Sequence, residues 1–142
     1  MPTTFFEADT VREIASRILP SAHPHLATAR ILYIFRDKAA KEGNKPLAGE
    51  VSKVSGVNEY LLKADFLMVI AQDLWNEMDG NRRDALVDHL LTYCYGEEDE
   101  KDPGAPMKWR IRRPDVKEFT EVLNRRGKWN QGACYPLWQP YL

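Results

Sequence analysis

A helical pattern of apolar residues runs from Asp79 to Tyr95 and organises the rest of the chain. Two neighbouring stripes of a 3.6-residue period are apolar, formed by Leu86, Leu90, Tyr93, Val87, Leu91 and Cys94. Asp79 or Asn81 is suited to cap the start of this helix, and Gly96 to end it with a positive φ. So wide an apolar face predicts that the helix lies under a sheet.

Residues before this helix predict one further helix and three strands. Helical spacing marks the segment from Glu7 to Leu19, which we expect Pro20 to end. The runs 29–35 and 66–71 are apolar enough for buried strands, and 47–54 alternates as a half-buried strand does. We expect the 29–35 and 47–54 strands to pair antiparallel across the turn between them, and 66–71 to be central. Short helical turns are expected at 59–64 and 72–78.

The chain changes character after the organising helix. Residues 96–106 form an acidic loop rich in Pro and Gly, and 107–113 alternate apolar and basic residues as an edge strand does. A last helix is expected at 115–127. The whole pattern predicts an α+β fold in which a small, mostly antiparallel sheet of about three to four strands packs on the organising helix, with an N-terminal and a late C-terminal helix.

Length and charge exclude several classes of protein. A chain of 142 residues predicts a single domain, 1–142, with an N-terminal helix within 1–20. The net charge of −1 excludes a globally basic nucleic-acid binder. Cys94 and Cys134 lie far apart, which favours a reducing cytoplasm, and no run approaches the roughly 18 apolar residues of a membrane span. We therefore expect a cytoplasmic protein without membrane contact.

The aromatic tail at 129–142 has no periodicity but is dense in Trp and Tyr. Such side chains are seldom left in water, so the tail either packs on its own domain, which we favour, or contacts another chain.

The organising helix contains one half of a zinc-peptidase motif. His89 stands where a His-Glu-x-x-His motif would begin, but Leu90 takes the place of the glutamate and Tyr93 that of the second histidine. The motif needs two imidazoles to hold the metal and a glutamate to take a proton from the bound water. The sequence therefore predicts that this helix does not hydrolyse peptides in that way.

The other two histidines, His23 and His25, lie in a proline-containing turn after the first helix. A nearby histidine pair invites a metal-binding interpretation. Because exposed loop histidines are commonly just polar, we favour that simpler interpretation here.

Several segments together resemble the phage metallopeptidase family, small zincin-like proteins of bacteriophages and prophages. They are residues 31–39, 60–75, 83–89 and 115–119. The resemblance covers roughly residues 27–129 and implies a minimal zincin-like core over 27–128.

The resemblance implies which residues replace the family's metal motif. His89 matches the first ligand, while Leu90, Tyr93 and Pro114 stand where the family has glutamate and two histidines. With three of four positions changed, we expect no catalytic residue and no zinc, and we expect His89 to be a hydrogen-bonded core residue. A weak site rebuilt from His89, Tyr93 and an acidic residue of 97–100 is the less favoured alternative.

A phage scaffold without its metal motif suggests a binding protein. We expect it to bind a bacterial host protein complex and to inhibit a defence system, in an anti-CRISPR-like role in the host cytoplasm. The residues expected to bind the partner are aromatic or basic: Trp109, Arg110, Arg112, Arg113, Trp129, Tyr135, Trp138 and Tyr141.

Two other functions and one assembly stay open. A zinc metallopeptidase with altered ligands is the first alternative. The second is nucleic-acid binding through the basic residues between Met107 and Lys128, since basic and aromatic side chains together grip phosphates and stack on bases. Homodimerisation is also left open.

Overall fold

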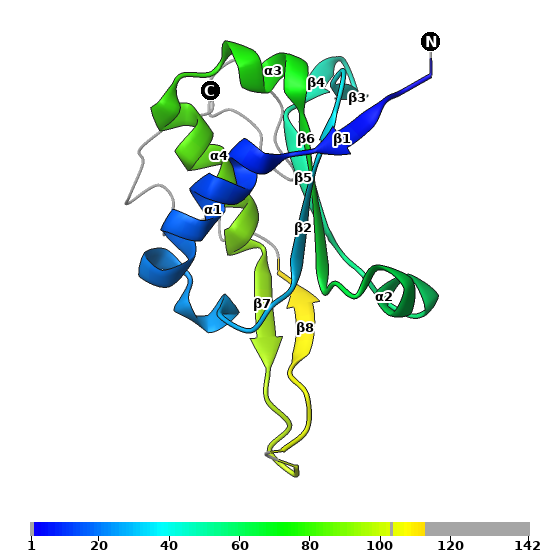
Figure 1. Cartoon of the computed structure of the whole chain (residues 1–142), viewed down its shortest axis with the longest axis vertical. Coiled ribbons are helices and arrows are strands. Elements are labelled where there is room, and N and C mark those ends of the chain that lie inside the picture. Colours follow the sequence, from blue (N-terminus) through cyan, green and yellow to red (C-terminus); the bar gives the residue numbers. More distant parts are fainter. Residues whose placement is uncertain (1, 103, 113–142) are drawn as a thin grey trace.

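A four-stranded mixed sheet organises the residues that this computed structural model describes, which are 2–102 and 104–112 (Figure 1). Its strand order is β1 (Phe5–Glu7), β2 (Ile31–Arg36), β6 (Phe66–Ala71) and β5 (Gly49–Lys53). The central pair β2–β6 is parallel, whereas β1–β2 and β5–β6 are antiparallel. The expected α+β class and mostly antiparallel sheet are therefore confirmed.

The expected pairing of the 29–35 strand with the 47–54 strand is wrong. β6 lies between them and pairs with both, running from Ile31 opposite Phe66 to Arg36 opposite Ala71 on the β2 side. β6 is apolar throughout and buried or half-buried at every position, so it takes an inner place, while β5 is largely exposed and takes an edge. Burial of both faces thus outweighs nearness in sequence.

The expected 47–54 strand corresponds to β5, and only its first residue, Leu47, belongs to a separate strand. β4 (Lys45–Leu47) forms a hairpin with β3 (Ala40–Glu42), and the chain then crosses buried Ala48 into β5. Gly43 makes the hairpin turn with φ +64°, a conformation that glycine adopts without strain.

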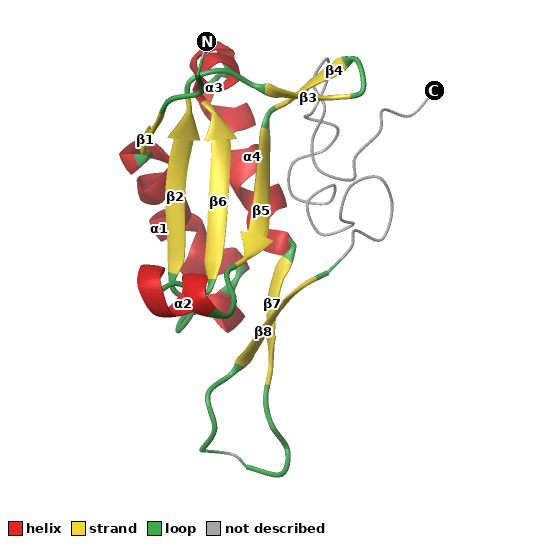
Figure 2. Cartoon of the chain, turned by 90° about the vertical axis from the view of Figure 1, so that its right-hand side faces the viewer, coloured by secondary structure: helices red, strands yellow, loops and turns green. Residues whose placement is uncertain are grey.

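Helices α1 (Asp9–Ala22) and α4 (Gly80–Thr92) cover one face of the sheet (Figures 1 and 2). The helix α1 buries Val11, Ala15 and Ile18. It starts later than predicted because the residues before it pair with β2 as strand β1. Pro20 does not end it as expected, because proline removes only one N–H donor and the last turn is still closed by the bond from the His23 N–H to the Leu19 carbonyl, 2.9 Å.

The helix α4 begins as predicted and ends earlier. The Asp79 carboxylate caps it by accepting from the Arg82 N–H at 2.8 Å. The predicted end at Gly96 is wrong, because the chain leaves the helix after Thr92 and enters β7 (Cys94–Glu97), which pairs with β8 (Lys108–Ile111). Gly96 faces Trp109 in that pair, and a Cβ there would lie only 2.7 Å from the indole.

The remaining elements follow the sequence pattern. The helical turns expected at 59–64 and 72–78 are α2 (Val57–Leu62) and α3 (Gln72–Glu77), and the expected edge strand at 107–113 is β8. A 3-10 turn at Pro24–Leu26 follows α1. The predicted helix at 115–127 and the aromatic tail at 129–142 lie outside the described residues. Across 2–102 and 104–112, no helix has the length and apolarity to cross a bilayer.

Candidate functional site

The C-terminal two-thirds of α4 is buried at eight consecutive positions, from Ala85 to Thr92. A helix shows its side chains on all sides, so continuous burial means that neighbours cover it all around. Three of the eight side chains are polar, namely Asp88, His89 and Thr92. Buried polar groups need partners, and these three therefore define the candidate site.

His89 packs against the aromatic residue that stands where the family's second ligand would be. Its side chain has no exposed surface, and its ring lies 5.1 Å from the ring of Tyr93 at an interplanar angle of 88°. This is the edge-to-face arrangement that aromatic rings prefer. One turn of α4 thus presents an imidazole and a phenol ring in contact.

Leu90 fills the position of the family's glutamate with carbon. It is fully buried, and its Cδ1 lies 3.1 Å from the point where a Cβ on Gly49 would stand. Gly49 is the first residue of β5, so Leu90 is packed against the edge strand of the sheet. Pro114, the fourth position of the motif, lies outside the described residues.

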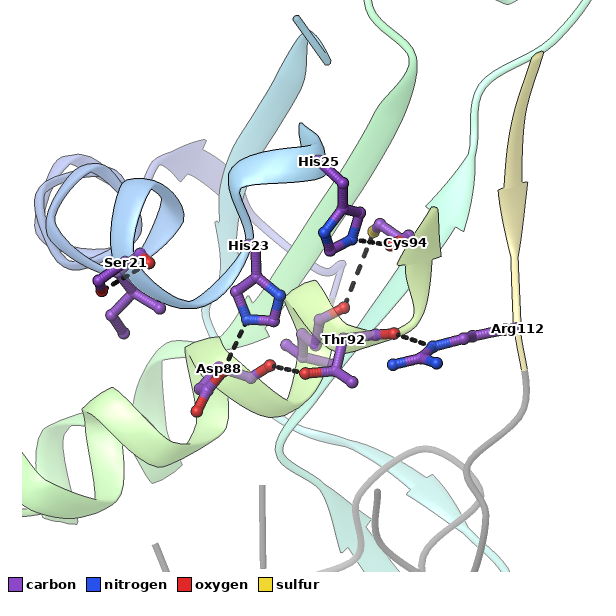
Figure 3. A network of polar contacts seen from close by, with 9 residues as sticks. Ser21, His23, His25, Asp88, Thr92, Cys94 and Arg112 are labelled. Carbon is purple, nitrogen blue, oxygen red and sulfur yellow. Dashed lines mark hydrogen bonds and ion pairs between the residues drawn. The ribbon is translucent and has the colours of Figure 1, made fainter. Parts of the chain in front are cut away.

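Cys94, the first residue of β7, is a buried thiol. Burial raises the pKa of this thiol well above its ordinary value, so it stays protonated at neutral pH. Its Sγ donates to the Leu90 carbonyl at 3.8 Å (Figure 3). A neutral buried thiol is a poor nucleophile.

The residues present at the family's motif do not fit a zinc ion. A catalytic zinc needs three protein ligands, and here one imidazole stands beside a leucine and a phenol ring. Within 2–102 and 104–112, no three His, Cys, Asp or Glu side chains gather closely enough to hold a metal ion. We therefore derive no reaction step from a metal at this position.

Asp88 forms a buried pair with a histidine far away in sequence. The His23 Nε2 lies 2.7 Å from the Asp88 Oδ1, with 3% and 0% of the two side chains exposed (Figure 3). The simpler interpretation of His23 as an exposed polar residue is therefore wrong. The turn after α1 carries His23 inward onto α4, because a carboxylate on a buried helix needs a partner of this kind.

The pair belongs to a set of contacts that dock α1 on α4. One turn before Asp88, Asp84 accepts from the Arg17 guanidinium on α1 at 2.7 Å. Within α4 itself, the Thr92 hydroxyl donates to the Asp88 carbonyl at 2.6 Å. The sequence held a signal for this cluster, since Asp88 is a charged residue in an otherwise apolar segment, but it did not name the partner.

The two turn histidines have different partners. His25 is exposed, and its Nε2 lies 3.3 Å from the Cys94 carbonyl on β7, whereas His23 bonds Asp88 on α4. Their ring centroids are 5.8 Å apart in an edge-on arrangement. The two side chains therefore connect the turn to α4 and to β7 by hydrogen bonds.

Three of the residues expected to bind a partner lie in the described region. Trp109 is only 8% exposed and packs edge-on against Phe66, 5.8 Å between ring centroids. Arg110 forms an ion pair with Glu97 at 3.0 Å, and the Arg112 Nε donates to the Thr92 carbonyl at 2.7 Å (Figure 3). The other five lie outside the description: Arg113, Trp129, Tyr135, Trp138 and Tyr141. A role of all eight in partner binding stays a prediction.

A surface that the sequence did not point to is the helix α2. None of its residues is buried, and four of its side chains are large, apolar and exposed: Val57 at 72%, Tyr60 at 81%, Leu61 at 65% and Leu62 at 47%. We call these four residues the α2 patch. Beside it lie two adjoining hollows of about 250 and 330 Å³, which share Glu59, Asp65, Pro106, Met107 and Trp109 in their walls.

Comparison with known proteins places the chain in a family. A model of the family described as "Putative phage metallopeptidase" matches residues 3–136, nearly the whole chain. No curated protein and no solved structure matches it.

Proposed function

The chain belongs to the phage metallopeptidase family, and we propose that it is a member that binds a protein instead of cleaving one. The observation that carries the proposal is the packing of Leu90. Its side chain occupies the glutamate position of the motif and lies directly on β5, where a Cβ on Gly49 would meet it at 3.1 Å. A side chain of carbon can neither accept a proton nor orient a water for attack.

The neighbouring residues support the same proposal. His89 and Tyr93 pack edge to face, and both are almost fully buried, as core side chains are. Asp88, the carboxylate next along the helix, is bound to His23 in the contact between α4 and the turn after α1. These polar groups thus serve the packing of α4.

A member without hydrolytic chemistry would act on its host by occupying a surface. The α2 patch supports such a role, because several large apolar side chains exposed on one short helix are typical of a protein contact. We propose a host protein complex as the target, and inhibition of a bacterial defence system, in an anti-CRISPR-like manner, as the result. This finer assignment rests on the phage origin of the family.

The metal content of the purified protein tests the proposal most directly. We expect protein purified without chelator to hold far less than one equivalent of zinc, and its unfolding midpoint to be the same with and without EDTA. The matched control is the variant Leu90→Glu/Tyr93→His/Pro114→His, which restores the family's motif and should gain zinc. One equivalent of zinc in the natural chain, lost in His89→Ala, would overturn the proposal in favour of a peptidase with altered ligands.

A plating assay tests the finer assignment. Expression of the chain in bacteria with an active defence system should raise the plating efficiency of a targeted phage. His89→Ala should act equally well, because no step depends on the imidazole. Unchanged plating across the host's defence systems would contradict defence inhibition and leave the metal result standing on its own.

Nucleic-acid binding has weaker support from the described residues. Arg110 is already paired with Glu97, and Arg112 donates to a backbone carbonyl, so both guanidinium groups are engaged within the chain. A gel shift that weakens steeply with salt would be the result that favours this alternative.

A further inference from the structure

The four-stranded sheet has a second face, on the side away from α1 and α4 (Figure 2). Side chains alternate along a strand, so the buried residues of β2 and β6, such as Tyr33 and Met68, alternate with residues of this second face. Those residues are all aliphatic and half-buried: Leu32, Ile34, Leu67 and Val69. None of the four is among the side chains that pack against the buried core. We call these four residues the open face.

The register of the sheet joins the open face into two rows. Leu32 lies opposite Leu67, and Ile34 lies opposite Val69. The two strands are parallel, and parallel strands usually carry helices on both faces of their sheet. Of the described helices only α2 lies on this side, at the lower ends of the strands, and it buries none of its own residues (Figures 1 and 2). Within residues 2–102 and 104–112, the layer that this face lacks is therefore a helix.

Glutamates flank the upper row of the open face on both sides. Glu7 on β1 lies beside Ile34, and Glu50 on β5 lies beside Val69. Glu7 accepts from Arg12 at 2.9 Å, whereas Glu50 is exposed and has no ion pair in the part of the chain that is described. A helix lying on the two central strands would meet the Glu50 carboxylate along the β5 side. Charge complementarity then requires Lys or Arg on that flank of the helix.

We propose that the open face binds an amphipathic helix of a partner protein, with the apolar stripe of the helix on the two aliphatic rows and a basic flank beside Glu50. The proposal rests on the proposed function and adds the kind of partner segment that the surface fits. At the upper end of the face, Arg36 donates its Nε–H to the Lys38 carbonyl at 2.7 Å and is thus engaged within the chain.

The dimensions of the open face fit one helix. A helix is about 10 Å across and neighbouring strands are ~4.8 Å apart, so one helix spans both central strands. The two rows lie two residues apart, roughly 7 Å, so two to three helical turns cover them. Such a contact is smaller than a standard stable interface. We therefore expect a dissociation constant on the order of 10 to 100 µM.

Binding of two synthetic peptides to the full chain tests the proposal. A helical peptide of leucine and lysine about 18 residues long, with its leucines at helical spacing, should bind with saturation, and the matching leucine–glutamate peptide should bind at least tenfold more weakly. Glu50→Lys should weaken binding of the lysine peptide about three- to tenfold and strengthen that of the glutamate peptide. Fluorescence anisotropy of the labelled peptides measures each affinity.

The matched control is Glu13→Lys on α1. It makes the same change of net charge at an exposed position away from the open face, and it should leave both affinities unchanged. Absence of saturable binding, or equal losses in Glu50→Lys and Glu13→Lys, would overturn the proposal. Stoichiometric zinc in the natural chain would overturn the proposed function and leave the peptide result standing, so the two failures are distinguishable.

Cysteine labelling locates the contact. Val69→Cys in a Cys134→Ser background puts a thiol on the open face, while Cys94 is buried. We expect this thiol to react with a maleimide in the free protein, and at least tenfold more slowly with saturating lysine peptide. Ser16→Cys on the exposed side of α1 should react equally fast with and without the peptide. A thiol at position 69 that the peptide does not protect, or that is unreactive already in the free chain because the chain covers it, would overturn the proposal. Far-UV circular dichroism confirms that each variant is folded.

Discussion

The helices α4 and α2 reverse the usual distribution of polar and apolar residues in opposite ways. The helix α4 buries Asp88 and His89 completely within eight consecutive buried positions. The helix α2 buries nothing and exposes Tyr60 and Leu61 at 81% and 65%. One helix places polar groups where apolar ones are common, and the other does the reverse.

The difference lies in what covers each helix. In α4 the buried carboxylate has found its partner, because His23 lies 2.7 Å from it, and the leucine at the glutamate position is packed on β5. In α2 the apolar side chains are left exposed. The two helices thus differ in what surrounds them: α4 is covered on all sides over Ala85–Thr92, and α2 lies exposed on the other side of the sheet.

The largest expected effect is the loss of the buried carboxylate. Asp88→Ala leaves His23 buried without its partner and should lower the free energy of unfolding by about 3–5 kcal/mol. Asp84→Ala is the matched control one turn earlier, because its ion pair with Arg17 lies at the surface and is worth at most about 1 kcal/mol. Urea unfolding of both variants measures the difference. Equal losses would mean that the buried pair contributes no more than the surface one.

The next largest effect is expected from truncating the Leu90 side chain, which stands at the position of the family's glutamate. Leu90→Ala opens a cavity between α4 and β5 and should cost about 2–5 kcal/mol in urea unfolding. Leu90→Met keeps the volume and should cost less than about 1.5 kcal/mol. If Leu90→Ala were nearly neutral, the leucine would not be part of the packing, and the proposal of a member that binds without cleaving would lose its main support.

The buried Tyr33 makes stability depend on pH in the alkaline range. Burial, with a smaller contribution from Cys94, raises the pKa of Tyr33 to about 12 from an ordinary value near 10. The fold thus favours the neutral phenol, so this contribution is present in full below pH ~10 and is lost as the pH rises through about 12. The raised pKa of the Cys94 thiol acts in the same direction from a somewhat lower pH.

Unfolding at several alkaline pH values tests this expectation. Tyr33→Phe should lose about 2 kcal/mol less stability than the natural chain across this alkaline range. A natural chain that is as stable near pH 12 as near pH 9 would contradict the role of burial at Tyr33.

The elements that the sequence predicted well are those set by local patterns. The strand Phe66–Ala71 and the Asp79 cap were predicted at the right residues, since an unbroken apolar run and a capping carboxylate act within a few residues. The pairing of β2 with β6 was missed, because strands compete for the inner position and the winner depends on burial of the whole sheet. The hairpin at Gly43 was missed because its strands are only three residues each.

In the candidate site, too, residues close in sequence could be predicted together and residues joined only by the fold could not. His89, Leu90 and Tyr93 lie on one turn of α4, so a motif read along the chain was enough to bring them together. His23 lies 65 residues from Asp88, and only the docking of α1 on α4 joins them. The α2 patch was predicted as a helical turn, but its exposure depends on what the rest of the fold leaves uncovered.

The smallest expected effect on stability belongs to the α2 patch itself, and it sharpens the comparison most. Leu61→Ser should change the free energy of unfolding by less than about 0.5 kcal/mol in urea unfolding, because 65% of the residue is already in water. A larger loss of stability would mean that Leu61 packs as part of the core, as Leu90 does, and the contrast between α2 and α4 would not hold.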